Sequence, residues 1–198
     1  MRVKIVFFDA LHTIVKPRLP IFQQYAEEFS PYFSVEPQRI KTAFKDALKQ
    51  VQVERPAYSG QTTSIHGNNV ESWWGDVIRR TAIGAGADRA IVEESLPQIV
   101  PRLLHRFSSK EGYVLFDDTL PTIEALSQRG IQTGLVSNTD KRMRLVLEDL
   151  GVLSMLSPVL FSSEEGVEKP SSEIWHRALQ RAEVQAPDAL HVGDELDA

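Results

Sequence analysis

The second half of the chain alternates short apolar runs with segments of helical periodicity, and this alternation constrains the fold more than any other feature. Strands are expected at residues 133–136, 159–161 and 190–192, with helices at residues 121–129, 141–150 and 172–183. Such alternation is typical of a parallel sheet with helices on its faces. A further run near the start, residues 3–8, is too short for a helix and too apolar for an edge strand. The pattern predicts an α/β fold with a doubly wound, Rossmann-like parallel sheet.

A long stretch of different character separates the first strand from the others. Pro17 and Pro20 interrupt the chain. Helical patterns then follow at residues 21–29, 37–51, 70–81 and 90–107, and a polar loop is expected at residues 54–69. We therefore expect residues 16–110 to form a helical cap inserted after the first core strand. Residues 1–15 and 111–198 are expected to form the α/β core.

The composition excludes several classes of protein. The 198 residues carry 22 Lys+Arg against 27 Asp+Glu, a formal net charge of −5, which argues against a nucleic-acid partner. The absence of cysteine excludes disulfides, zinc–thiolate sites and a cysteine nucleophile, and it suits a reducing compartment. No apolar run approaches the roughly 20 residues that span a bilayer, and the start lacks the features of a signal peptide. We expect an intracellular, cytoplasmic protein with no membrane partner.

Polar residues follow four of the predicted strands, three directly at the strand end and one at the end of the loop after the strand. They are Asp9, with Thr13 four residues later, then Ser137-Asn138, Lys169-Pro170 and Gly193-Asp194. Taken singly, each has an ordinary structural explanation as a strand end, a helix cap, a solvated lysine or a turn. In an open parallel sheet, however, ligands bind beyond the carboxyl ends of the strands. The ordered set therefore predicts one site at that edge.

This ordered set resembles the four motifs of the haloacid dehalogenase-like hydrolase superfamily. The first motif is matched by Asp9-Ala10-Leu11-His12-Thr13. The subgroup of haloacid dehalogenase-like hydrolase domain-containing protein three is resembled by Tyr25-Ala26, Trp73-Trp74, Asp140 and Glu165-Gly166. The resemblance extends over essentially the whole chain. It implies a Mg²⁺-dependent phosphatase that acts on a small phosphorylated molecule.

The resemblance also implies a role for each matched residue. Asp9 would be the nucleophile that forms an aspartyl-phosphate. Ser137 and the backbone N–H of Asn138 would bind phosphate oxygens, and Lys169 would neutralise the nucleophile and the transferring group. Thr13 would brace the loop. Mg²⁺ would be held by the Asp9 carboxylate, the Leu11 backbone carbonyl and the Asp194 carboxylate.

Leu11 departs from the pattern that the resemblance implies. Phosphatases of the superfamily carry a second Asp at this position as general acid and base, and leucine cannot transfer a proton. The adjacent His12 is a candidate substitute because histidine titrates near neutrality, although it is equally a loop residue that faces away. Two alternatives to phosphatase activity follow. One is a catalytically degenerate binding or regulatory protein. The other is 2-haloacid dehalogenase chemistry, because the first motif also resembles that of the haloacid dehalogenases, whose reaction needs neither a metal nor a proton for the leaving group.

The fourth motif also departs from the pattern. An acidic residue is expected four or five positions after Asp194, and the fourth position is Ala198. We expect a chain that is short at its C-terminus, with an exposed sheet edge beside the last strand. Such an edge is prone to pair with another chain, so a homodimer through it is plausible.

Other residues have simpler explanations. Residues 116–120 (FDDTL) also resemble the first motif, but they precede a predicted helix, and Asp117, Asp118 and Thr119 are expected to cap it. One of Trp73 and Trp74 is expected in the core of the cap, while the other is a candidate to face the site. The remaining histidines have no metal-ligand spacing and are expected to be structural: His66, His105, His176 and His191.

Overall fold

A computed structural model of the chain describes residues 3–55 and 70–194. The chain divides into two compact units, of which one comprises Met1–Lys16 with Tyr113–Ala198 and the other comprises Pro17–Gly112. The first is called the α/β unit and the second the helical unit. None of the helices described is long and apolar enough to cross a membrane.

A four-stranded parallel sheet forms the centre of the α/β unit, in the order β5-β4-β1-β6. Its strands are β1 (Ile5–Phe8), β4 (Gln132–Ser137), β5 (Val159–Phe161) and β6 (Ala189–Val192). Four helices belong to the same unit, α5 (Thr119–Gln128), α6 (Arg142–Asp149), α7 (Ser162–Glu165) and α8 (Ser172–Arg181). The predicted α/β fold with a parallel sheet is confirmed.

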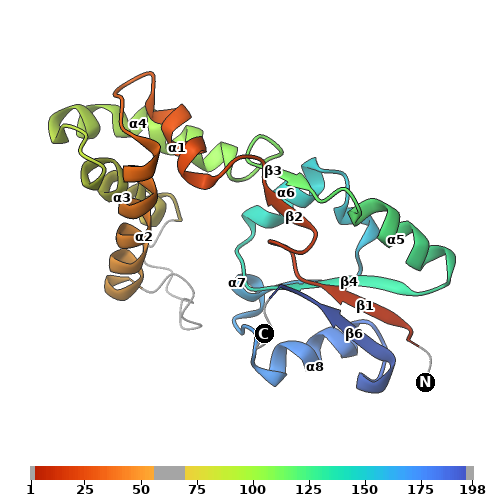
Figure 1. The fold of residues 1–198 in the computed structure, drawn as a ribbon. Coiled ribbons are helices and arrows are strands. Elements are labelled where there is room, and N and C mark those ends of the chain that lie inside the picture. The colour runs from red at the N-terminus through yellow and green to blue at the C-terminus, as the bar shows by residue number, and fades with distance from the viewer. Residues whose placement is uncertain (1–2, 56–69, 195–198) are drawn as a thin grey trace. The chain divides into compact units, whose positions relative to one another are not determined.

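Helices pack on both faces of the sheet, and side chains alternate between the two faces along each strand. Val6 and Phe8 pack with residues of α5 and α6, whereas Ile5 and Phe7 pack with residues of α8. Figure 1 shows α8 on one side of the sheet and α5 and α6 on the other. Phe7 lies close over β4, where a methyl group on Gly134 would be 2.8 Å from its ring. The residues of β1 are thus buried on both faces, as the apolar sequence of that strand predicts.

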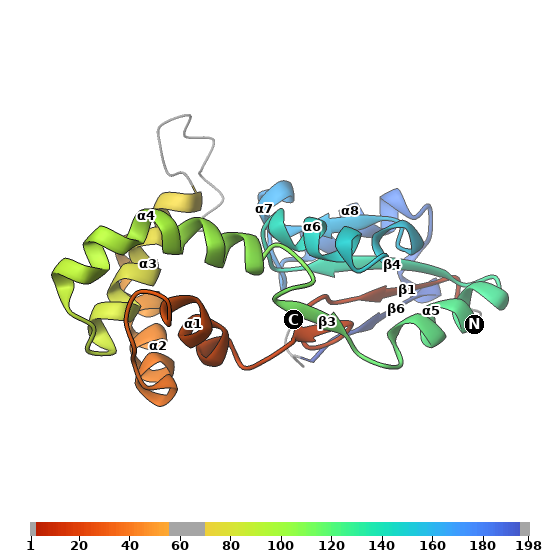
Figure 2. The ribbon, with the colours of Figure 1, turned by 90° about the horizontal axis from the view of Figure 1, so that it is seen from above.

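The helical unit contains α1 (Ile21–Phe29), α2 (Pro37–Glu54), α3 (Val70–Gly84) and α4 (Arg89–Arg106). In this unit α2 packs against α1 and α3, and α4 packs against α3 and α1 (Figure 2). Pro37 occupies the first turn of α2, and the Asp88 carboxylate accepts the Ala90 and Ile91 backbone N–H groups at the start of α4. Tyr25, at the centre of the core, makes edge-to-face contacts with Phe29 and Phe44.

Several local expectations differ from the structure. A short second sheet, β2 (Val15–Pro17) with β3 (Tyr113–Leu115), lies where no strand was predicted. Helix α2 continues to Glu54, so the predicted loop begins inside a helix, and its remainder, residues 56–69, lies outside the described residues. The prediction that Asp118 caps α5 is wrong, because its side chain makes no capping hydrogen bond. Thr119 instead donates its hydroxyl to the Ile14 carbonyl at 2.9 Å, which ties α5 to the segment after β1.

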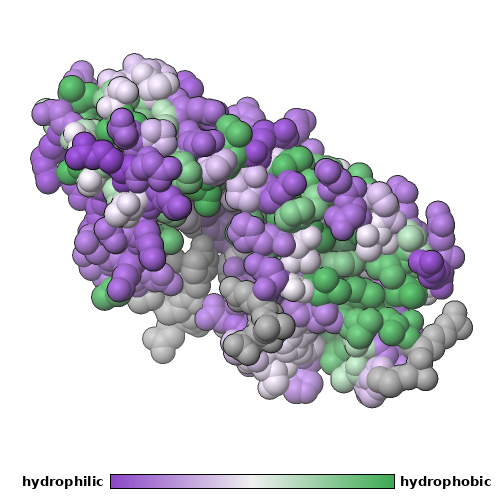
Figure 3. Space-filling view, viewed as in Figure 1, coloured by the Kyte–Doolittle hydropathy of each residue, from purple (hydrophilic) through white to green (hydrophobic). Residues whose placement is uncertain are grey.

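β6 is an outer strand of the described sheet, as expected. Leu190 and Val192 are 52% and 44% exposed. Figure 3 shows hydrophobic residues gathered on this face of the α/β unit, over β1 and β6. Pairing of this edge with a second copy of the chain stays a prediction.

Candidate active site

The strand order brings the carboxyl ends of three strands to one edge of the sheet. Asp9 follows β1 in the middle, Ser137 ends β4 on one side, and Asp194 follows β6 on the other. The Asp9 backbone N–H donates to the Val192 carbonyl at 2.9 Å, which ties the ends of β1 and β6 together. This is the edge at which ligands bind in open parallel sheets.

Lys169 reaches this edge from the segment after β5 and forms an ion pair with Asp9. Its Nζ lies 3.2 Å from Asp9 Oδ2, and the two side chains are 2% and 15% exposed. The Ala10 backbone N–H donates to Asp9 Oδ1 at 2.8 Å. Charges interact more strongly in a buried site than in water. The Asp9 carboxylate is therefore held in one orientation, with an ammonium on one oxygen and an amide on the other.

Asn138 holds Lys169 in place through its side chain. Its Nδ2 donates to the Lys169 carbonyl at 2.9 Å, and its Oδ1 accepts the Lys169 backbone N–H at 2.8 Å. These two hydrogen bonds join the end of β4 to the backbone of the lysine. The role suggested by the resemblance, phosphate binding by the Asn138 backbone N–H, stays a prediction.

A network of ion pairs anchors the chain just before Lys169. The Glu165 carboxylate is 8% exposed and contacts Arg181 at 2.6 Å and Arg177 at 3.3 Å. Burial raises the pKa of Glu165, but hydrogen bonds and charge from the two arginines outweigh it and leave that pKa lowered. Gly166 follows with a φ of 67° and ends α7. The segment that carries Lys169 is thus fastened to α8.

The segment after β4 is fixed by the carboxylate of Asp140. Its carboxylate accepts the Arg142 backbone N–H at 2.9 Å and the Arg142 Nη2 at 2.6 Å. Ser137, at the end of the strand, is 3% exposed, and its carbonyl accepts the Thr139 N–H at 3.0 Å. Asp140 thus fixes the chain at the start of α6, and Ser137 lies at the end of β4, next to β1.

The chain after Asp9 forms a tight loop. The Val15 N–H donates to the Ala10 carbonyl at 3.0 Å, and the His12 N–H donates to the Val15 carbonyl at 2.8 Å. His12 has a φ of 62° and an exposed side chain. Thr13 contributes to the loop through its backbone N–H, at 3.3 Å from the Ala10 carbonyl, while its buried hydroxyl has no hydrogen-bond partner among the described residues. Bracing of the loop by Thr13 stays a prediction.

The residues expected to bind Mg²⁺ supply the donors that this ion prefers. A methyl group on Gly193 would lie 3.7 Å from Asp9 Cβ, so the chain that leads to Asp194 passes directly beside Asp9. No residue in the described ranges donates a hydrogen bond to the Leu11 carbonyl. Two carboxylates and a free carbonyl are hard oxygen donors, which suit Mg²⁺. The described residues include no cluster of three His, Cys, Asp or Glu side chains that could hold a metal, and binding of Mg²⁺ by Asp9, Leu11 and Asp194 stays a prediction.

His191, expected to be structural, lies close to the site. Its ring packs edge-on against Trp175 with centroids 4.6 Å apart, and its Nε2 is buried without a partner in the described part of the chain. Burial, and then the charge of Lys169, lower the pKa of His191, against the opposing effect of Asp9. The available sequence signal was a polar residue inside an apolar strand, two positions before Gly193.

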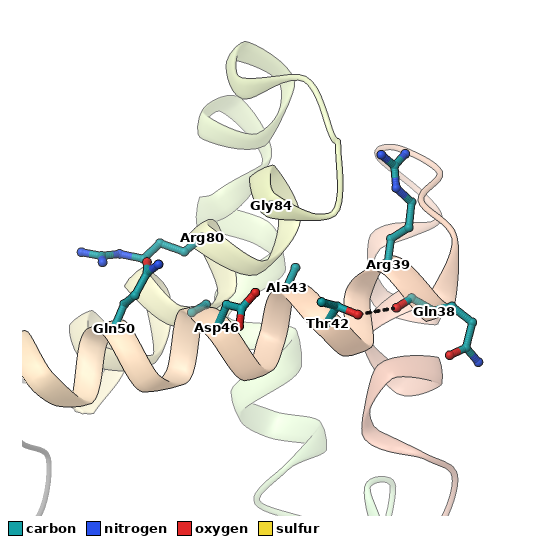
Figure 4. A pocket seen from close by; sticks show the side chains of 9 residues that line it. Gln38, Arg39, Thr42, Ala43, Asp46, Gln50, Arg80 and Gly84 are labelled. Carbon is teal, nitrogen blue, oxygen red and sulfur yellow. Dashed lines mark hydrogen bonds between the residues drawn. The ribbon is translucent and has the colours of Figure 1, made fainter.

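The helical unit contains a separate groove of about 560 Å³ between α2 and α3 (Figure 4). Its lining includes Arg80, which is already paired with Glu54 at 2.6 Å and Asp76 at 3.0 Å. We place the candidate site at the sheet edge, where a buried ion pair and three strand ends meet.

In the helical unit Trp73 is buried and donates to the Arg55 carbonyl at 2.8 Å, which confirms one tryptophan in the core. Orientation of Trp74 towards the site stays a prediction.

Comparisons with known proteins show which family this chain resembles. A family model described as haloacid dehalogenase-like hydrolase matches residues 3–197. The haloacid dehalogenase-like hydrolase domain-containing protein 3 of Danio rerio is 30% identical over 198 residues, which cover 98% of this chain and 78% of that protein.

Three solved structures share the fold. The L-2-haloacid dehalogenase RSc1362 has a TM-score of 0.67 at 16% identity, with 98% of this chain and 79% of that chain covered. The HAD phosphatase from Thermococcus onnurineus has a TM-score of 0.55 at 20% identity, with 100% and 79% covered. The HAD-hydrolase YfnB from Bacillus subtilis, bound to magnesium, has a TM-score of 0.63 at 18% identity, with 100% and 82% covered.

Proposed function

Because the chain belongs to the haloacid dehalogenase-like hydrolase family, we propose that it hydrolyses a small phosphate monoester through an aspartyl-phosphate on Asp9. The observation that carries the proposal is the contact between Lys169 Nζ and Asp9 Oδ2, 3.2 Å apart at the carboxyl ends of the strands. A fixed carboxylate beside a buried ammonium suits attack on a phosphoryl group, because the ammonium stabilises the negative charge on the transferring oxygens.

The proposed reaction has two displacements at phosphorus. In the first, an Asp9 oxygen bonds to phosphorus while the bond to the leaving oxygen breaks, and that oxygen takes a proton. In the second, water attacks the phosphorus, the bond to Asp9 breaks, and inorganic phosphate leaves while Asp9 returns to a carboxylate. Ser137 and the Asn138 N–H would bind the phosphoryl oxygens, and Lys169 would hold its charge against them throughout.

Asp9, Leu11 and Asp194 would hold a Mg²⁺ ion, as their oxygen donors allow. When bound, the ion would polarise the phosphoryl oxygens and offset the repulsion between the phosphate and the Asp9 carboxylate. The magnesium-bound YfnB structure supports the choice of ion for a protein of this fold.

Position 11 supplies no general acid to protonate the leaving group, because leucine cannot donate a proton. The exposed side chain of His12 is the nearest candidate acid along the chain. General acid catalysis contributes about 10²–10⁴-fold, so an aryl phosphate with a good leaving group should be cleaved much faster than an alkyl phosphate. Histidine at position 12 would then matter for the alkyl substrate and little for the aryl one.

Hydrolysis of 4-nitrophenyl phosphate with Mg²⁺ tests the proposal. The wild-type protein should release nitrophenol, and Asp9→Asn should reduce the rate to background. Asp118→Asn is the matched control, because Asp118 belongs to the second motif-like segment and is exposed. Equal rates for wild type and Asp9→Asn would refute the proposal.

Leu11 also favours a second candidate function, dehalogenation of a 2-haloacid. In this reaction an Asp9 oxygen attacks the carbon that carries the halogen, and halide leaves without a proton. Halide release from a 2-haloacid in the absence of metal, lost in Asp9→Asn, would establish it in place of phosphatase activity. A protein that catalyses neither reaction would instead be a binding or regulatory member of the family.

A further inference from the structure

His191 lies on the side of β6 that faces α8, next to the proposed active site. It pairs in register with Phe7 of β1, and its ring packs against Trp175 of α8. The exposed Leu190 and Val192 on either side of it face the other way, as alternation along the strand requires. His191 is therefore the residue of β6 whose side chain enters the packing between the sheet and α8 closest to the site.

The far end of the imidazole reaches the backbone of Gly193. A methyl group on Gly193 would lie 3.0 Å from His191 Cε1, 3.5 Å from His191 Nε2 and 3.7 Å from Asp9 Cβ. Gly193 thus packs closely against both the imidazole and Asp9, and a side chain at this position would press on the ring, a close approach that glycine avoids. The ring forms part of the surface against which this backbone packs.

The contacts of the imidazole with the described residues are almost entirely van der Waals contacts. Its Nε2 is buried and has no hydrogen-bond partner among the described residues. The charges that act on it are those of Lys169 and Asp9, which form the central pair of the site. A ring with a buried, unpartnered nitrogen against a glycine backbone fills space and supports the turn.

We infer that His191 is a positioning residue, whose ring is wedged between Trp175 and Gly193 and holds the Gly193–Asp194 turn beside Asp9. The use of that turn rests on the proposed function, since Asp194 would be a ligand for Mg²⁺. The support itself is a property of the α/β unit and can be measured without any substrate. Residues around metal ligands commonly change metal affinity by about 10–100-fold when they are mutated.

Hydrogen exchange of the metal-free protein tests the support directly. The Asp9 N–H, which donates to the Val192 carbonyl, should exchange at least about tenfold faster in His191→Ala than in wild type, because local opening becomes easier. His191→Phe keeps a ring in the same space and should restore slow exchange. His176→Ala, at an exposed histidine of α8, is the control and should match wild type. Unchanged exchange in His191→Ala would overturn the inference.

The Mg²⁺ dependence of 4-nitrophenyl phosphate hydrolysis provides the second measurement. His191→Ala should raise the half-saturating Mg²⁺ concentration about tenfold and leave the KM for the substrate at saturating Mg²⁺ within about twofold. An unchanged Mg²⁺ requirement, or a His191→Phe variant as impaired as His191→Ala, would overturn the inference. If the wild-type protein hydrolyses nothing, the proposed function fails, and the exchange measurement still decides whether His191 supports the turn.

Discussion

Lys169 is buried to an extent that is rare for a lysine, with 2% of its side chain exposed. Its ammonium is balanced by Asp9, and its backbone is held on both sides by the amide of Asn138. Desolvation of such a deeply buried charge costs free energy, and the ion pair with Asp9 offsets that cost. Of the contacts between individual side chains, the Asp9–Lys169 ion pair is therefore the one that most directly supports a catalytic site.

Replacement of this lysine by methionine should remove activity and preserve shape. Lys169→Met keeps the apolar stem and removes the ammonium, so kcat for 4-nitrophenyl phosphate should fall by about 10²–10³, as for the loss of one charge-stabilising donor. Lys141→Met, at an exposed lysine after β4, should leave kcat unchanged. A Lys169→Met variant with the wild-type kcat would show that the ammonium takes no part in the reaction.

At this scale the sequence could predict which residues would meet but not what each side chain would do. Asp9, Ser137, Lys169 and Asp194 share one sheet edge because the order of parallel strands requires it. The alternative of a solvated Lys169 is wrong, since solvation depends on the neighbouring segments. The Asn138 amide binds the backbone of Lys169, which is distant in the sequence, and the His191 ring packs against the backbone of Gly193. No local sequence pattern encodes either contact.

The segment from β5 to α8 shows how elements position the lysine. Glu165 at the end of α7 binds Arg177 and Arg181 of α8, and Arg177 also donates to the Glu165 carbonyl at 2.6 Å. Arg177 and Arg181 lie four residues apart and so project from one side of the helix. The two helices clamp the chain just ahead of Lys169.

The lowered pKa of Glu165 makes a prediction about pH. Since the pKa is lower in the folded state than its ordinary value of 4.5, the carboxylate stabilises the fold fully above pH 4.5 and progressively less as pH falls through the folded pKa. Glu165→Gln should reduce the free energy of unfolding at pH 7 by about 1–3 kcal/mol, the value of hydrogen bonds to a charged group.

Urea unfolding at several pH values measures this difference. The gap between wild type and Glu165→Gln should narrow below pH 4.5. Glu168→Gln, at an exposed glutamate of the same segment, is the control and should show little loss at any pH. A gap that stays constant from pH 7 into the acid range would contradict the assigned role of Glu165.

Elements with their own periodicity were predicted well, and elements that depend on a partner were not. The bounds of α1 and β5 agree with the expectation, and those of β4 and β6 agree within a residue. The strands β2 and β3 are three residues long and form because they pair with each other, although the helical unit separates them in the sequence. Short segments of this kind have no alternation long enough to detect.

At the scale of the whole molecule, the chain passes twice between the two units, near Lys16 and near Gly112. Within the helical unit these two passages are tied by Gln24, which is fully buried. Its Nε2 donates to the Leu19 carbonyl at 2.7 Å and to the Gly112 carbonyl at 3.1 Å. Gly112 is required there, because a methyl group on it would lie 2.5 Å from the Arg106 carbonyl oxygen.

Loss of the Gln24 amide should therefore destabilise the helical unit where both passages meet. Gln24→Ala leaves the Leu19 carbonyl without this donor, whereas the Gly112 carbonyl keeps the Arg18 N–H at 2.9 Å. A buried polar group that loses its partner costs about 1–3 kcal/mol. Gln23→Ala, at the exposed neighbouring position, should be nearly neutral. Equal thermal unfolding of the two variants would show that the tie between the passages is dispensable.

Asp9 is the proposed nucleophile of a phosphatase reaction, and the mechanism depends on it more than on any other residue. The most direct measurement is an acid quench during hydrolysis of 4-nitrophenyl phosphate with Mg²⁺, followed by mass spectrometry of the peptide that contains Asp9. One phosphoryl group is expected on Asp9 in the wild-type protein and none on that peptide in Asp9→Asn. Steady hydrolysis with no phosphoryl group on Asp9 would contradict this mechanism.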